Sequence, residues 1–166
     1  MNRIVNELRQ RGLTVTFAES CTGGLLAKLI TDVPGASAVF RGSVVSYSAE
    51  IKEKLLGVSP ETVRIYGEVS RETALEMARG ARRAIGADIA VSVTGSAGPE
   101  PDEPGKPVGL IWLAADCDAG SRAVSIQNDF PADARRLNRE AAADAAKKLI
   151  FDILSQGKIA FGENVE

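Results

Sequence analysis

The segment ESCTGG, which follows a predicted strand, places possible nucleophiles beside a glycine-rich turn. The Ser20 hydroxyl or the Cys21 thiol could attack a carbonyl carbon. Glycines let a ligand approach the main chain, and consecutive N–H groups at the start of a helix can bind a phosphate or the oxyanion of a tetrahedral intermediate. In the alternative interpretation a side chain only caps the helix and the glycines ease packing. The N–H groups concerned belong to Thr22, Gly23 and Gly24.

A second candidate lies in the segment YSAEIK, from Tyr47 to Lys52. A strand that leads into a helix would place Tyr47 at the strand end and Lys52 in the first helical turn. Lysine is a poor base at its usual pKa of about 10.4, but burial and the positive end of a helix both favour its uncharged form. The chain contains no histidine, so a desolvated lysine is the most credible partner for activating a serine. The nearby Lys54 illustrates the alternative, which is a solvated surface lysine.

Two further features could contact a ligand. The turn TGSAGP follows a buried strand, and it could present the Thr94 hydroxyl and main-chain groups around Gly95, although many such turns only connect elements. Arg135 belongs to a cluster of arginines at the start of the last predicted helix. Most such clusters lie on the surface, whereas the functional alternative is one arginine that reaches a phosphate.

The sequence gives no indication of a metal site or a bound cofactor. The absence of histidine excludes Ser-His-Asp and Cys-His catalysis and the histidine zinc sites. Cys21 and Cys117 form neither a CxxC pair nor a disulfide framework. Three carboxylates in a proline-rich loop are expected to be solvated rather than to bind a metal ion. They belong to Glu100, Asp102 and Glu103.

The elements that must position these residues alternate between helical and strand patterns. Their order favours the α/β class, as a single three-layer domain with a mixed β-sheet flanked by helices. Gly42 suggests a β-bulge or a close approach of the backbone, and Ser70 is a suitable N-cap. The last helix is expected to bury Leu137, Ala141, Ala145 and Leu149. The predicted strands are 13–18, 38–46, 88–93 and a hairpin of 108–115 with 122–130, and the predicted helices are 1–11, 25–30, 49–56, 60–65, 71–85 and 133–155.

Composition narrows the functional classes. A chain of 166 residues suits one domain, here residues 1–166, with a loosely held tail at about 156–166. Its 20 Lys and Arg residues against 22 Asp and Glu residues provide no strongly basic surface for a nucleic acid. No stretch approaches the roughly 20 apolar residues of a membrane span, and the N-terminal segment lacks the apolar core of a signal peptide. We therefore expect a cytoplasmic protein.

Taken together, five segments in order resemble the C-terminal domain of the CinA competence/damage-inducible family, over about residues 4–154. The joint pattern is highly specific, although each segment alone is a weak signal. The family includes stand-alone nicotinamide mononucleotide deamidases, so the resemblance implies hydrolysis of that carboxamide to nicotinate mononucleotide and ammonia. It also implies a frequently oligomeric protein. The segments are AESCTGGLLAKLITDVPGAS, GSVVSYSAEIKEKLLGV, GEVSRETALEMARG, VTGSAGP and KPVG.

The resemblance also implies roles for individual residues. Ser20 would be the nucleophile, Lys52 the base and proton shuttle, and Tyr47 a positioning or relaying group, while Thr94 would contact the substrate. The chain departs from the family pattern in its altered GDR-type motif, where Arg135 stands one position late. Glu68 replaces a common alanine, and this change is expected to be minor. A non-catalytic protein of the competence or DNA-damage response, which binds a nucleotide or a partner, is the alternative function.

Overall fold

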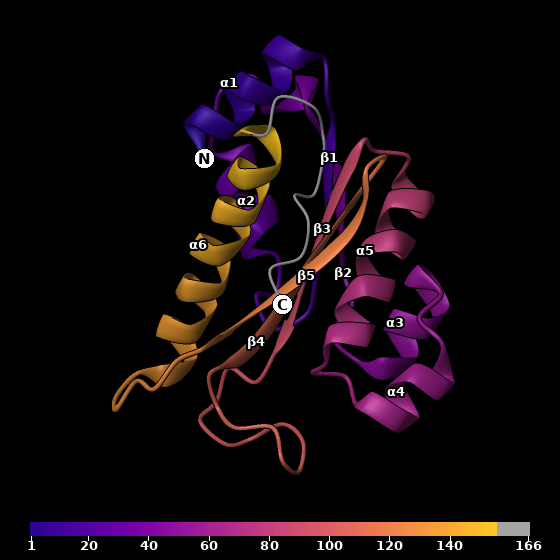
Figure 1. Cartoon of the computed structure of the whole chain (residues 1–166). Helices are drawn as coiled ribbons and strands as arrows, with labels where there is room; N and C mark the ends of the chain where they lie inside the picture. The colour runs from indigo at the N-terminus through magenta and orange to yellow at the C-terminus, as the bar shows by residue number, and fades with distance from the viewer. Residues whose placement is uncertain (156–166) are drawn as a thin grey trace.

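A mixed five-stranded sheet between two layers of helices forms the part of the chain that the computed structural model describes, residues 1–155 (Figure 1). The α/β fold class predicted from the sequence is confirmed, whereas the predicted loose tail at 156–166 lies outside the described residues. The strands are β1 (Val15–Glu19), β2 (Phe40–Val45), β3 (Ile89–Gly95), β4 (Leu110–Cys117) and β5 (Gly120–Gln127). The helices are α1 (Asn2–Arg11), α2 (Leu25–Thr31), α3 (Ala49–Leu56), α4 (Pro60–Tyr66), α5 (Arg71–Ile85) and α6 (Ala134–Ser155), with a short 3₁₀ helix η1 (Ala36–Ala38).

The strand order β2-β1-β3-β4-β5 brings distant segments to one edge of the sheet. β1 pairs in parallel with β2 and with β3, while β4 and β5 are antiparallel additions. The three parallel strands therefore end at the same edge, which we call the carboxyl edge. Such an edge is where ligands gather in α/β sheets, because helix N-termini and free N–H groups point toward it.

Helices cover both faces of the sheet. α1, α2 and α6 lie on one face, and α3, α4 and α5 lie on the other (Figure 1). Every residue of β1 and β3 is buried, as expected for parallel strands covered on both sides. None of the helices in residues 1–155, α6 included, is both long and apolar enough to cross a lipid bilayer.

Local sequence signals place the helices around the site. Ser48, Ser59 and Ser70 each cap a helix, because their side chains accept a hydrogen bond from a main-chain N–H in the first turn. The predicted start of α5 after Ser70 is therefore confirmed. The bulge predicted at Gly42 is also present, since the register of β1 with β2 shifts there and Gly42 has a φ of 138°.

The buried face of α6 differs from the predicted one. Leu137, Ala141 and Ala145 are only partly buried, whereas Leu149 is buried as expected. The helix is rich in alanine on several sides, so the pattern of apolar residues does not define one face. The residues that pack against the sheet and its neighbours include Ala142, Ala146, Ile150 and Ile153.

Candidate active site

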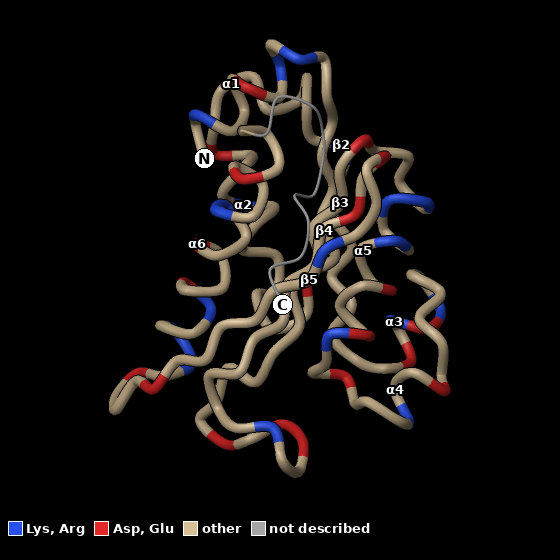
Figure 2. The backbone as a smooth tube through the Cα atoms, in the orientation of Figure 1, with Lys and Arg blue, Asp and Glu red and all other residues tan. Residues whose placement is uncertain are grey.

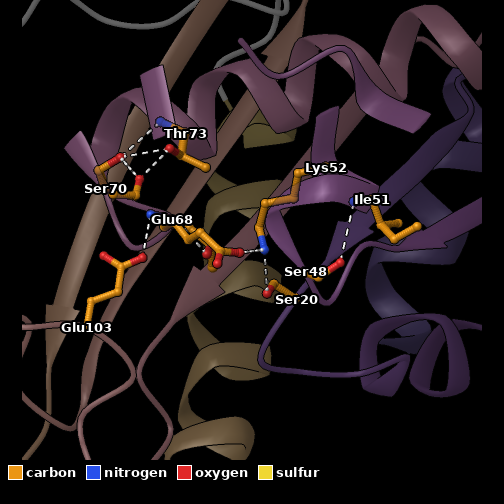
Figure 3. A network of polar contacts seen from close by, with 10 residues as sticks. Ser20, Ser48, Ile51, Lys52, Glu68, Ser70, Thr73 and Glu103 are labelled. Carbon is orange, nitrogen blue, oxygen red and sulfur yellow. Dashed lines mark hydrogen bonds and ion pairs between the residues drawn. The ribbon is translucent and has the colours of Figure 1, made fainter. Parts of the chain in front are cut away.

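Ser20 and Lys52 meet at the carboxyl edge. Ser20 follows β1 directly, and its N–H donates to the carbonyl of Val93 at 2.9 Å, which fixes the start of the turn against β3. The Lys52 side chain comes from α3, and only 1% of the residue is exposed. Its Nζ lies 3.2 Å from Ser20 Oγ (Figure 3). The two groups are therefore within proton-transfer reach of each other.

The structure separates Lys52 from the surface lysine Lys54. Residues that are two positions apart on a helix project about 200° apart, so the Lys52 side chain points toward the sheet and the Lys54 side chain points toward solvent. Lys54 is exposed, whereas Lys52 is buried. The predicted burial of Lys52 is thus confirmed, and Lys54 provides a matched control on the same helix.

Glu68, in the loop between α4 and α5, is a member of this cluster that the sequence did not identify. Its Oε2 lies 2.6 Å from Lys52 Nζ (Figure 3). Glu68, whose difference from the family pattern was expected to be minor, thus lies in direct contact with the candidate base. The two groups form an ion pair in which the amine is buried and the carboxylate is partly exposed. The local sequence of this loop contains no signal for the contact, because Lys52 belongs to a different helix.

Two neighbouring segments hold the main chain of Glu68 in place. Its N–H donates to Glu103 Oε1 at 2.5 Å, and its carbonyl accepts a hydrogen bond from Thr94 Oγ1 at 2.8 Å. Thr94 therefore contributes to the site by fixing this loop. Glu103 reaches the same loop from the segment between β3 and β4, so both the N–H and the carbonyl of Glu68 are hydrogen-bonded to other segments.

The Glu19 carboxylate binds N–H groups at the end of the glycine-rich turn and at the start of α2. This carboxylate is fully buried at the end of β1. It accepts hydrogen bonds from the N–H groups of Gly24 at 3.0 Å, Leu26 at 3.0 Å and Ala27 at 2.9 Å, and from the Ser43 hydroxyl at 3.2 Å. The N-terminus of α2 thus already has its anion within the chain. The expectation that the Gly24 N–H binds a substrate anion is corrected accordingly.

Of the three N–H groups that were predicted to bind a substrate anion, only that of Thr22 has no acceptor among the described residues. The Gly23 N–H donates to the carbonyl of Ser20 at 3.0 Å, so it too is occupied. The Thr22 N–H makes no hydrogen bond to another residue within 1–155. Thr22 is fully buried, its Oγ1 has no partner among the described residues, and its carbonyl accepts a hydrogen bond from Arg139 at 2.8 Å.

Cys21 differs from Ser20 in its chemical state. Burial raises the pKa of the Cys21 thiol to about 12, so the residue is a neutral thiol at neutral pH. A thiol is a weak nucleophile compared with a thiolate. The choice between the two nucleophiles that the sequence left open therefore favours Ser20, whose hydroxyl already has an amine beside it.

A pocket of about 190 Å³ opens beside Ser20. Tyr47 and Arg135 lie on its wall, and the Arg135 guanidinium donates to Tyr47 Oη at 2.7 Å and to the carbonyl of Gly98 at 2.7 Å. The Tyr47 hydroxyl is thus hydrogen-bonded to Arg135, and among the described residues it forms no hydrogen bond with Ser20 or Lys52. Of the predicted site residues the pocket collects Ser20, Tyr47, Thr94, Gly95 and Arg135, whereas Lys52, Thr22, Gly23 and Gly24 lie outside its lining.

Gly95 ends β3 in the wall of this pocket, where the neighbouring strand leaves no room for a side chain. A Cβ at this position would lie 2.8 Å from the Cα of Ile111 in β4. The glycine is therefore required for the pairing of the two strands, which brings the end of β3 to the pocket.

The acidic loop between β3 and β4 reaches the pocket as well. Asp102 and Glu103 are part of its lining, and acidic stretches are visible in this loop at the bottom of Figure 2. The expectation that these carboxylates are simply solvated is therefore wrong for Glu103, which binds the Glu68 N–H. In the described residues, no group of three or more cysteine, aspartate or glutamate side chains is arranged to hold a metal ion.

The carboxyl edge of the sheet is where α/β proteins commonly bind small ligands, and here a pocket and a buried serine–lysine pair lie at that edge. The family model of the CinA C-terminal domain matches residues 1–154. The chain belongs to the CinA C-terminal domain family.

Relatives at the sequence level fall into two groups by length. A CinA-like protein of Chloroherpeton thalassium is 46% identical over 150 residues, which cover 89% of this chain but 36% of that protein. The chain spans about a third of the length of such curated relatives. The nicotinamide-nucleotide amidohydrolase PncC of Escherichia coli (strain K12) is 44% identical over 142 residues, which cover 86% of each chain.

Solved structures of the same superfamily have the same fold. A CinA superfamily protein from Klebsiella pneumoniae superposes with a TM-score of 0.88 at 31% identity, over 93% of this chain and 94% of that one. A competence/damage-inducible protein from Agrobacterium tumefaciens gives a TM-score of 0.87 at 39% identity, over 93% and 92% of the two chains.

Proposed function

We propose that this protein is a nicotinamide-nucleotide amidase that hydrolyses the carboxamide of nicotinamide mononucleotide to nicotinate mononucleotide and ammonia. The observation that carries the proposal is the 3.2 Å contact between Ser20 Oγ and the buried Lys52 Nζ beside a pocket. The name of the Escherichia coli relative, which matches over most of both chains, supports the substrate. Amide hydrolysis needs a nucleophile, a base and an oxyanion donor, and the site offers a candidate for each.

In the first half of the proposed reaction, Ser20 Oγ attacks the carboxamide carbon and its proton passes to the uncharged Lys52 amine. The oxyanion that forms on the carboxamide oxygen accepts a hydrogen bond from the Thr22 N–H. Lys52 then donates a proton to the amide nitrogen, the C–N bond breaks, and ammonia leaves. The product of this half is an ester of Ser20 with the nicotinate carbonyl.

In the second half, water hydrolyses this ester. The water oxygen attacks the ester carbon, and the Lys52 amine, now uncharged again, accepts a proton from this water. The proton then returns to Ser20 Oγ as the C–O bond breaks, and nicotinate mononucleotide is released. Lys52 thus acts alternately as base and acid, which is the role that histidine has in other serine hydrolases.

Other residues of the pocket would hold the substrate. Arg135 has N–H groups beyond those used by Tyr47 and Gly98, so it is our candidate for the substrate phosphate. Tyr47 would pack its ring beside the nicotinamide ring while its hydroxyl orients Arg135. Thr94 would act through the loop that carries Glu68, since its hydroxyl is already bonded there.

The test is ammonia release from nicotinamide mononucleotide by the wild-type chain and by Ser20→Ala, Lys52→Ala and Lys54→Ala. We expect activity in the wild type and in Lys54→Ala, and loss in the other two. An inactive wild type would contradict the proposal and would favour the alternative, a non-catalytic binding protein. A fully active Ser20→Ala variant would contradict the mechanism.

A further inference from the structure

Glu68 lies between the buried base and the open pocket. Its carboxylate binds Lys52 Nζ at 2.6 Å, yet its side chain is 32% exposed while that of Lys52 is 1% exposed. Glu68 also belongs to the pocket lining, whereas Lys52 does not. A ligand that enters the pocket therefore meets the carboxylate before it meets the amine.

The lining of the pocket has more negative than positive side chains. Its acidic and basic members are the carboxylates of Glu68, Asp102 and Glu103 and the guanidinium of Arg135. Arg135 already donates to Tyr47 Oη, and this ring stands on the same wall. Carboxylates beside an aromatic face are complementary to a flat organic cation, through charge attraction and through the cation–π interaction.

We propose that Glu68 determines specificity by selecting substrates whose carboxamide stands on a cationic, N-substituted pyridinium ring. This inference rests on the proposed amidase function and deepens it. It concerns the carboxylate that lies between the candidate base and the pocket.

The same contact connects substrate charge to the chemical step. In the proposed mechanism Lys52 must be uncharged to accept the proton of Ser20, and its Nζ lies 2.6 Å from the Glu68 carboxylate. A pyridinium cation in the pocket would interact with the Glu68 carboxylate and so weaken the attraction of this carboxylate for Lys52. The cation would also repel a positive charge on Lys52. An uncharged ring does neither, so it leaves the Lys52–Glu68 ion pair as it is.

The matched probes are nicotinamide mononucleotide and its reduced 1,4-dihydro form, which carries the same carboxamide, ribose and phosphate on an uncharged ring. Affinities would be measured by calorimetry in a Ser20→Ala background, which prevents turnover. We expect the cationic probe to bind about tenfold more tightly, as a partly exposed charge pair would give. In Ser20→Ala/Glu68→Gln we expect the two affinities to agree within about twofold.

Glu50→Gln in the same background is the control, because it removes an exposed carboxylate from α3, and it should keep the preference. Equal affinities in the Ser20→Ala background, or a preference that persists in Ser20→Ala/Glu68→Gln, would overturn the inference, as would the absence of binding of either probe. Far-UV circular dichroism would verify that each variant is folded. Failure of the wild type to release ammonia would instead overturn the amidase function, so the two failures are distinguishable.

Discussion

The two ends of the neighbouring strands β1 and β3 carry polar clusters of opposite character. At the amino ends, Asp88 Oδ2 accepts hydrogen bonds from the Thr14 N–H and hydroxyl, both at 2.7 Å, and the Asp88 N–H donates to Thr14 Oγ1 at 3.1 Å. These hydrogen bonds join the two residues reciprocally. At the carboxyl edge, the Ser20, Lys52 and Glu68 side chains converge beside a pocket.

The difference indicates that the residues that stabilise the sheet and the residues that could react lie at opposite ends of the same two strands. The hydrogen bonds at the amino end stabilise the carboxylate form of Asp88 and lower its pKa. This cluster therefore stabilises the pairing of β1 with β3. The cluster at the carboxyl edge brings a hydroxyl, an amine and a carboxylate together beside a pocket. It lies where the following turns and helices leave room for a ligand.

The largest expected effect is that of Ser20→Ala. If the carboxyl edge is the reactive end, removing Oγ should lower ammonia release from nicotinamide mononucleotide by about a thousandfold or more. The measurement is kcat by an ammonia assay, with the thermal midpoint recorded alongside. A loss of activity accompanied by unfolding would assign a structural role to Ser20 instead.

Lys52→Met should follow, with kcat reduced by about a hundredfold or more, because a positioned acid–base group contributes about 10²–10⁴-fold. Lys54→Met is the matched control, since the same change is made on the exposed side of α3. Equal losses in both variants would remove the distinction between a buried base and a surface lysine. Comparable activity of Lys52→Met and wild type would exclude Lys52 as the base.

Asp88→Asn should affect the opposite end of the strands and leave kcat within about twofold of the wild type. We expect a decrease of about 1–2 kcal/mol in the free energy of unfolding at pH 7, since a hydrogen-bonded carboxylate is weakened. Urea unfolding would provide the measurement. A large loss of activity with unchanged stability would mean that the two ends are not separate in function.

The pH dependence of stability should distinguish Asp88 further. Its hydrogen bonds with Thr14 lower its pKa in the folded state, so its contribution is complete above the unfolded value of about 3.9 and is lost as the pH falls through the folded pKa. The wild type should therefore lose more stability than Asp88→Asn between pH 5 and strongly acidic solution. Parallel pH profiles of unfolding would contradict this assignment.

The smallest expected effect is that of a metal chelator on catalysis. In the proposed mechanism Ser20 and Lys52 supply the nucleophile and the proton transfers, so ammonia release in the presence of EDTA should equal that in buffer. A dialysed enzyme that regains activity with a divalent ion would contradict the mechanism. It would direct attention to the acidic loop that contains Asp102 and Glu103.

Short-range features of the fold followed from the sequence. The predicted ranges of α3, α4 and α5 agree closely with the structure. For α5 the predicted N-cap Ser70 is also correct, because capping depends on neighbouring residues. The absence of histidine and the order of the turns directed attention to Ser20 and Lys52. The buried face of α6 was not predictable, since a helix with alanine on several sides offers no single apolar stripe.

By itself, the sequence determined which residue types could do chemistry and that their segments follow strands or begin helices. The tertiary structure alone decided which groups meet. It placed Glu68 on Lys52 and Glu19 on the N–H groups that were expected to bind a substrate anion. The physical reason is that helix and strand signals act over a few residues, whereas a salt bridge or a buried carboxylate finds its partner through the packing of segments that are distant along the chain.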